Sequence, residues 1–378
     1  KWMTQLKKHK KTEPEYIEII KEGSEDIREK VLKYIMVRRT RSEIKKYFSK
    51  DIDEQGLFFP EVSDPIRLVY QFDATIGPVF SQTIEMLKQF SYSRYMPLVF
   101  INRQLTEFEL QAQRNVGGFM KGILVKRLES SFYAFKKSVG RFVKSYEDFI
   151  QMFGEGRVLI SKNINVYDLI DEDNEERIQR LIEEEKVQEY QSNEFTPEFE
   201  QALENDLIIL KDIRKLWNPI DADPKLDKFV SELETGGNLF GKKILVFTES
   251  LETGEYLFGK LKKKFGSEVL FFSSKGGLVE DERLVRSEAR RKITNNYDPR
   301  AREPEDDIKI LISTDVLAEG VNLHRSFSVI NYDLPWNPTR VLQRVGRVNR
   351  VGTENKEIHI YNFFPTAESD EHLGLEDN

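Results

Sequence analysis

The sequence contains no cysteine among its 378 residues, which excludes disulfide bonds and thiolate zinc sites. The longest apolar runs, such as Ile244–Phe247, are far shorter than the roughly 18 residues that a membrane-spanning helix needs. No signal peptide is recognisable. The histidines are widely separated: His9, His324, His359 and His372. We therefore expect a cytoplasmic protein that does not contact a membrane and has no metal site.

The negative charge is concentrated in one segment. The formal net charge of the chain is −7, but residues 168–206 alone contain 15 acidic and 3 basic residues, so the rest of the chain is net +5. Carboxylates in such a run repel a phosphate backbone. We expect residues 168–206 to form a helical insertion away from nucleic acid, and a basic stretch at 121–144 to favour backbone contacts.

The hydrophobic pattern changes near residue 223. Before it, apolar residues recur at helical spacing, as in 79–90 and 117–153. After it, short β-rich runs alternate with helical stretches, which predicts right-handed crossovers and a parallel sheet. The sequence therefore predicts an α/β lobe over residues 223–365, preceded by a mainly α-helical region over 51–222.

Polar residues follow the buried strand that begins the segment Ile310–Leu323. In open parallel sheets, ligands bind beyond the carboxyl ends of the strands. The Thr314 hydroxyl could bond a backbone phosphate, Asp315 could accept from a ribose hydroxyl, and Gly320 permits a close backbone approach. The alternative is that Ser313, Thr314 or Asp315 only caps a helix.

Arginines recur every three residues in the segment Leu342–Gly352. This spacing predicts that Arg344, Arg347 and Arg350 lie on one face of a helix, next to Gln343. Guanidinium groups so placed suit a polyphosphate, whose transition-state charge spreads over several oxygens. The alternative is an ordinary solvated basic face.

Taken together, STDVLAEGVNL, VINYDLPWNP and LQRVGRVNRVG resemble helicase motifs V and VI, and DLPWNP resembles the Swi/Snf branch of superfamily 2. The resemblance implies a RecA-like lobe in which Arg347 and Arg350 are arginine fingers that reach ATP on another lobe. It also implies nucleotide-proximal and strand-contacting residues. The former are Asp315, Gly320 and Gln343; the latter are Thr314 and Thr248.

Two upstream segments carry a weaker resemblance. Tyr34–Ile44 resembles the arginine-rich exit from the first lobe of Swi/Snf-type motors. Lys126–Phe135 is similar to the bacterial branch that includes the RNA-polymerase-associated remodeller and restriction-system helicases. On this basis residues 1–50 form a helical exit from a first lobe, 51–222 a linker or insertion, and 366–378 an acidic tail.

A P-loop needs a strand, a glycine-rich turn, a lysine and then a magnesium-binding hydroxyl. Gly236–Lys242 and Gly254–Lys260 have the glycine spacing but are followed by Lys243 and Leu261. We expect ATP and Mg²⁺ to be held mainly by a first lobe outside this sequence, and the chain alone to be inactive.

Three functions remain open. The first is the second lobe of an ATP-dependent helicase or translocase on double-stranded DNA. The second is a non-catalytic interaction module that docks a protein partner through its helical region. A lobe without a catalytic function, however, would not need Gln343, Arg347 and Arg350 at this spacing. The third is an RNA-directed helicase of the same superfamily.

Overall fold

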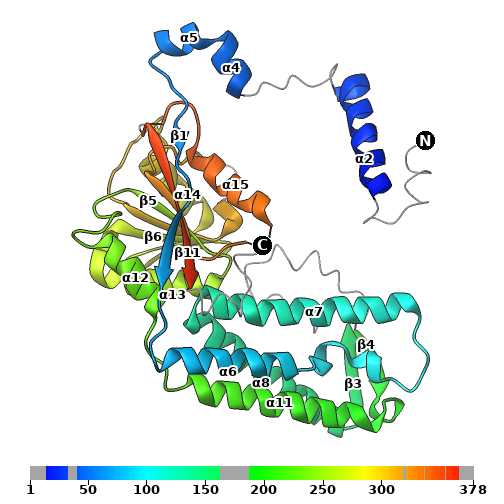
Figure 1. Cartoon of the computed structure of the whole chain (residues 1–378). Coiled ribbons are helices and arrows are strands. Elements are labelled where there is room, and N and C mark those ends of the chain that lie inside the picture. Colours follow the sequence, from blue (N-terminus) through cyan, green and yellow to red (C-terminus); the bar gives the residue numbers. More distant parts are fainter. Residues whose placement is uncertain are drawn as a thin grey trace. The chain divides into compact units, whose positions relative to one another are not determined.

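The computed structural model describes residues 14–32, 41–161, 187–317, 321–335, 337–353 and 355–365 (Figure 1). The chain divides into two compact units, residues 1–58 and 59–378. No helix in the described ranges is long and apolar enough to cross a membrane. The same ranges hold no group of three His, Cys, Asp or Glu residues arranged to bind a metal ion.

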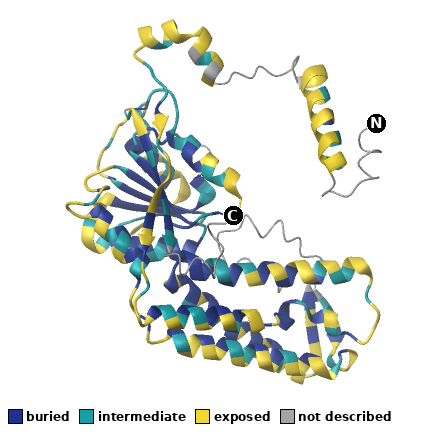
Figure 2. Cartoon of the chain, in the orientation of Figure 1, coloured by how far each residue is buried: buried dark blue, intermediate teal, exposed yellow. Residues whose placement is uncertain are grey.

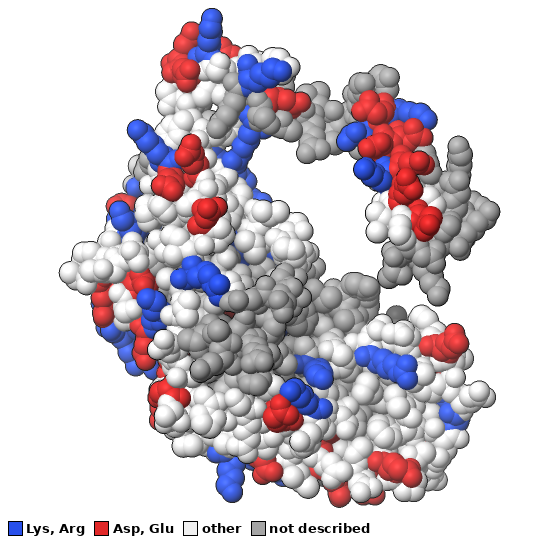
Figure 3. Space-filling model, viewed as in Figure 1, with Lys and Arg blue, Asp and Glu red and all other residues white. Residues whose placement is uncertain are grey.

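The first unit contains only helices among its described residues. Helix α2 has apolar side chains on its surface, among them Ile17, which is 61% exposed. Its polar positions are mostly acidic, and Figure 3 shows them as a largely red surface. The predicted exit segment Tyr34–Ile44 lies mainly outside the described residues. The helices are α2 (Pro14–Ile27), a π-helical turn (Arg28–Leu32), α4 (Arg41–Tyr47) and α5 (Ser49–Glu54).

The second unit is built on a mostly parallel sheet with strand order β1-β11-β10-β5-β9-β6-β7-β8, in which β2 also pairs with β11. The predicted α/β fold, with a RecA-like parallel sheet flanked by helices, is thereby confirmed. Strands β7 and β8 are antiparallel additions at one edge. The strands are β1 (Glu61–Val62), β2 (Ile66–Tyr70), β5 (Ile244–Phe247), β6 (Val269–Ser273), β7 (Gly276–Val279), β8 (Glu282–Leu284), β9 (Ile310–Ser313), β10 (Ser328–Asn331) and β11 (Glu357–Pro365).

Helices cover both faces of this sheet, which is why its central strands are continuous apolar runs. Every residue of Ile244–Phe247 and of Ile310–Ser313 is buried, as the dark blue strands of Figure 2 show. Alternate residues face different layers: Val246 packs with α12 and α13, and Leu245 packs with α14 and α15. The helices are α12 (Pro224–Leu233), α13 (Leu251–Phe265), α14 (Arg286–Tyr297) and α15 (Pro338–Val348).

The sheet also includes residues that the sequence pattern placed in the mainly helical region. Glu61–Val62 and Ile66–Tyr70 pair in parallel with β11, with Leu68 opposite Phe363. The pattern is easily missed because the second strand is short and buries only Leu68 and Tyr70. The α/β lobe is therefore discontinuous in sequence, and the helical region is inserted between β2 and β5.

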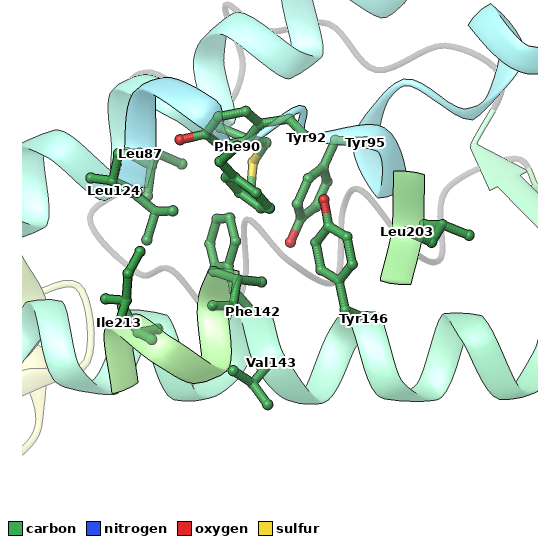
Figure 4. Packing of buried hydrophobic residues seen from close by; sticks show 14 of the residues in the cluster. Leu87, Phe90, Tyr92, Tyr95, Leu124, Phe142, Val143, Tyr146, Leu203 and Ile213 are labelled. Atoms are coloured by element: carbon green, nitrogen blue, oxygen red, sulfur yellow. The ribbon is translucent and has the colours of Figure 1, made fainter. Parts of the chain in front are cut away.

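In its described residues, that inserted region is a bundle of four helices around an aromatic core (Figure 4). The predicted helical stretch 117–153 is two helices, because the chain becomes extended at Ser131 (φ −160°, ψ 148°). A capping box between Thr106 and Glu109 begins the first of them. The bundle helices are α6 (Ile76–Gln89), α7 (Glu107–Ser130), α8 (Phe132–Gly154) and α11 (Pro197–Trp217).

The predicted acidic insertion differs from expectation where it can be described. Residues 168–186 lie outside the described residues. The remainder begins with strand β4 (Val187–Gln191), which pairs antiparallel with β3 (Arg157–Ser161). Further on, Phe199 and Leu203 of α11 are fully buried in the bundle core. Glu198, Glu200 and Glu204 are exposed on the outer face of this packed helix, whereas Asp206 is buried, so this part is no separate helical insertion.

Candidate functional site

The candidate site lies at the carboxyl ends of three neighbouring strands, β10, β5 and β9. Thr248 follows β5, Thr314 and Asp315 follow β9, and Asp333 follows β10. Because these strands are parallel and adjacent, their carboxyl ends meet at one edge of the sheet. This is the edge where parallel α/β sheets bind ligands.

The two predicted motifs are joined by an ion pair between Asp315 and Arg344. Nε of Arg344 lies 2.7 Å from Oδ1 of Asp315, and Nη2 lies 3.1 Å from Oδ2. The Arg344 side chain is fully buried, donates also to Oδ1 of Asn331 at 2.9 Å, and lies over the Phe247 ring. A bidentate pair is strong and directional. Asp315, predicted to lie near the nucleotide, therefore fixes the helix of the second motif against the end of β9.

The other two arginines of the motif are placed differently from the prediction of a single helical face. Helix α15 ends at Val348, so Arg350 lies beyond it. Arg347 belongs to the last helical turn, and both side chains are half-buried. Nη1 of Arg350 donates to Oδ1 of Asn322, and its Nε donates to the carbonyl of Gly346 at 3.2 Å. The amide of Leu323 also donates to the Arg347 carbonyl. The end of the first motif therefore lies against the end of the second.

The two threonines predicted to contact nucleic acid are fully buried. Oγ1 of Thr248 donates to Oδ2 of Asp333 at 2.6 Å, and the amide of Thr314 donates to the carbonyl of Phe272. Neither side chain is presented at the surface in this structure. Gln343, in contrast, is exposed. Gly320 lies outside the described residues.

A buried polar cluster around Asp333 was not predicted. Its carboxylate accepts from the hydroxyls of Ser130 and Thr248 and from the amide of Glu249 at 2.7 Å. Burial opposes ionisation, but the charges of Lys225 and Arg344 and these hydrogen bonds outweigh it, so the pKa of Asp333 lies below its usual value. The rule that marked Asp315, a carboxylate directly after a buried strand, would also have marked Asp333.

Comparison with known proteins identifies part of the chain. Residues 224–352 match the family model of the helicase conserved C-terminal domain. An uncharacterized ATP-dependent helicase, YqhH of Bacillus subtilis, is 47% identical over 66 residues, which are 18% of this chain and 12% of that protein. The ATP-dependent RNA helicase uap56 of Schizosaccharomyces pombe is 35% identical over 98 residues, 26% of this chain and 19% of that protein. The chain thus aligns with less than a fifth of either relative.

Two solved structures resemble larger parts of the chain at low identity. The C-terminal part of the Fun30 ATPase domain is 13% identical, with a TM-score of 0.40 over 84% of this chain and 89% of that one. The Pyrococcus furiosus Hef helicase domain is 14% identical, with a TM-score of 0.44 over 85% of this chain and 58% of that one. The family match supports the assignment of residues 224–352 as a helicase conserved C-terminal domain.

Proposed function

We propose that this chain is the second motor lobe of an ATP-dependent DNA translocase or helicase of the Swi/Snf type. In this proposal Arg347 and Arg350 are arginine fingers for ATP held on a P-loop lobe. The observation that carries the proposal is the unequal use of three equally spaced arginines. Arg344 is fully buried and paired with Asp315, whereas Arg347 and Arg350 are half-buried at the end of α15. The latter two can therefore reach a ligand outside the lobe.

The current contact of Arg350 is compatible with this role. Its partner Asn322 is neutral, and the Asn322 side chain is itself held by the carboxylate of Asp298 at 3.0 Å. Exchanging a neutral amide oxygen for a phosphate oxygen adds the attraction of two opposite charges to the hydrogen bond that the guanidinium makes. The approach of a triphosphate would therefore draw Arg350 away from Asn322.

Catalysis on this proposal is shared between two lobes. A P-loop lobe supplies the phosphate cradle and the magnesium site, neither of which this sequence provides. This chain supplies positive charge when phosphoryl transfer spreads negative charge over the equatorial oxygens. Contacts made mainly in the transition state raise kcat and leave substrate affinity little changed. The 378 residues by themselves should therefore hydrolyse no ATP.

The test is nucleic-acid-stimulated ATP hydrolysis by a polypeptide that carries both this chain and its P-loop lobe. Arg350→Ala and Arg347→Ala should each lower kcat by about 10³ to 10⁵, with a much smaller change in KM for ATP. Arg347→Lys should also lower kcat, because an ammonium group cannot reproduce the planar, two-pronged hydrogen bonding of a guanidinium. Arg302→Ala, at an exposed position of the same lobe, is the control. Near-normal turnover in either alanine variant would make that arginine an ordinary surface residue.

RNA is the alternative substrate, and the relative described as an ATP-dependent RNA helicase favours it. Stimulation by DNA and by RNA duplexes of equal length separates the two. Binding of DNA by the chain alone should be weak, independent of sequence and steeply salt-dependent, because backbone contacts dominate such binding. If only RNA stimulates hydrolysis, the DNA assignment is wrong and the motor assignment stands.

A further inference from the structure

The corner between α7 and α8 occupies the carboxyl edge of the sheet above β5 and β10. Ser130 ends α7 and its hydroxyl donates to Oδ2 of Asp333 at 2.5 Å. The hydroxyls of Ser130 and Ser131 are hydrogen-bonded to that of Thr253, with oxygen–oxygen distances of 2.7 and 2.9 Å. All four side chains are buried. The helical bundle thus fills the part of the edge at which an open parallel sheet would hold a ligand.

A buried lysine holds this corner in place from the lobe. Nζ of Lys225 donates to the carbonyls of Glu129 and Ser130 at 2.8 and 3.2 Å and lies 4.5 Å from the centre of the Tyr332 ring. It therefore satisfies carbonyls at the end of α7 that the helix leaves without partners. Removing one partner from such a buried charged cluster is costly. The bundle is consequently docked on the lobe at a defined position.

From this corner a chain of alternating charges leads to α15. Lys126, one turn before the end of α7, lies 3.3 Å from Oε2 of Glu249 and donates to the carbonyl of Leu334. The other Glu249 oxygen lies 3.6 Å from Nη1 of Arg340.

The same Nη1 of Arg340 lies 3.2 Å from Asp315, which holds Arg344. The order from the bundle to α15 is therefore Lys126, Glu249, Arg340, Asp315, Arg344. Each neighbouring pair carries opposite charges, and each lies within 4 Å.

Arg340 depends on its carboxylate partners because of where it lies. It is in the first turn of α15, where the positive end of the helix dipole disfavours a cation. Burial raises the pKa of Glu249, and the charge of Lys126 opposes that rise. Without Lys126, Glu249 would be a weaker counter-charge, and Arg340 would lose part of what holds it against the dipole.

We propose that Lys126 is a positioning residue through which the helical bundle sets the orientation of α15, and with it Arg347 and Arg350. The roles of those two arginines rest on the proposed function; the coupling itself does not. Arg340, Arg344 and Arg347 succeed one another at about one helical turn along α15, so a rotation of the helix moves all three. A ligand that shifts the bundle would therefore alter catalysis without touching the nucleotide.

The first arm of the test uses the 378-residue chain alone and measures amide hydrogen exchange of 338–348. Lys126→Met should accelerate exchange there about three- to fivefold, the range for loss of one partly exposed ion pair. Lys126→Arg should restore it. The control is Lys215→Met, an exposed lysine on α11 of the same bundle. Glu249→Gln, which keeps the side-chain volume, should accelerate exchange as Lys126→Met does. It replaces Lys126→Met in the test if the Lys126→Met protein does not fold.

The second arm measures ATP hydrolysis in the polypeptide that also carries the P-loop lobe. Lys126→Met should lower kcat about three- to fivefold and leave KM for ATP unchanged. Its effect and that of Arg340→Met should be less than additive, since both break the same chain of contacts. Lys215→Met should match the wild type in both parameters.

The outcomes separate the two ideas. Unchanged exchange of 338–348 in a folded Lys126→Met protein overturns the coupling. Accelerated exchange with unaltered kcat overturns its positioning role. Accelerated exchange in a protein whose wild type hydrolyses no ATP, even with its P-loop lobe, defeats the proposed function and leaves the coupling intact.

Discussion

The α/β lobe and the helical bundle each bury an aspartate completely, but they stabilise it in different ways. In the lobe, Asp333 is compensated by the cations Lys225 and Arg344, and the pKa of its carboxyl is lowered. In the bundle, Asp206 accepts from uncharged groups: the amides of Ser91 and Ser93 and the hydroxyls of Ser93 and Tyr146. There burial prevails over the hydrogen bonds, and the pKa of Asp206 is raised.

The difference follows from what each site must hold together. Asp206 joins the turn after α6 to α8 and α11, all within one aromatic core. Neutral hydrogen bonds are enough to hold these elements together, because the surrounding helices already pack tightly. Asp333 lies where the bundle meets the lobe, and where Lys225 of α12 and Arg344 of α15 come together. A network of charges fixes how the bundle docks on the lobe at that junction. The network at Asp333 is therefore more sensitive to the loss of one member than the neutral hydrogen bonds at Asp206 are.

The largest effect should come from Asp333→Asn. Neutralising this carboxylate leaves Lys225 and Arg344 buried with less compensation, which should lower the free energy of unfolding by about 3–5 kcal/mol. Urea unfolding followed by circular dichroism measures it. Asp281→Asn is the control, because its carboxylate pairs with Lys262 but is 98% exposed, and it should leave the midpoint unchanged. Equal midpoints for both variants would show that the cluster at Asp333 is not compensated as described.

A smaller effect is expected for Asp206→Asn. An amide offers one oxygen where the carboxylate offers two, so one of the two backbone amides loses its acceptor. An unsatisfied buried donor costs about 1–3 kcal/mol. The tyrosine and serine hydroxyls can turn to donate or accept, which limits the loss. Urea unfolding in the same conditions should rank this variant between wild type and Asp333→Asn, and the opposite ranking would contradict the comparison.

The smallest effect is the pH dependence, which should have opposite signs in the two regions. The contribution of Asp333 is full above the ordinary value of 3.8 and is lost as the pH falls through its lower folded pKa. The contribution of Asp206 is full below 3.8 and is lost as the pH rises through its higher folded pKa. The advantage of the wild type over Asp333→Asn should therefore shrink on acidification, and that over Asp206→Asn should grow. Parallel trends would refute the assignment.

The sequence predicted the central strands well because each is a run of apolar residues covered on both faces, as in Ile310–Ser313. It could not separate Arg344 from Arg347, since equal spacing says nothing about which guanidinium meets a carboxylate. The partners of Asp333 were also out of reach. Ser130 and Thr248 lie 203 and 85 residues away along the chain, and no local pattern reports such pairings.

The strand β2 has a consequence for how the protein is made. It pairs with β11, with Ile66 opposite Tyr361, so this side of the sheet cannot form until residues 66–361 have all left the ribosome. Such distant pairing slows folding and prolongs the exposure of strand edges. A polypeptide begun at residue 224, the first residue of the family match, would lack both β1 and β2. It would leave β11 as an open edge, which is a template for aggregation.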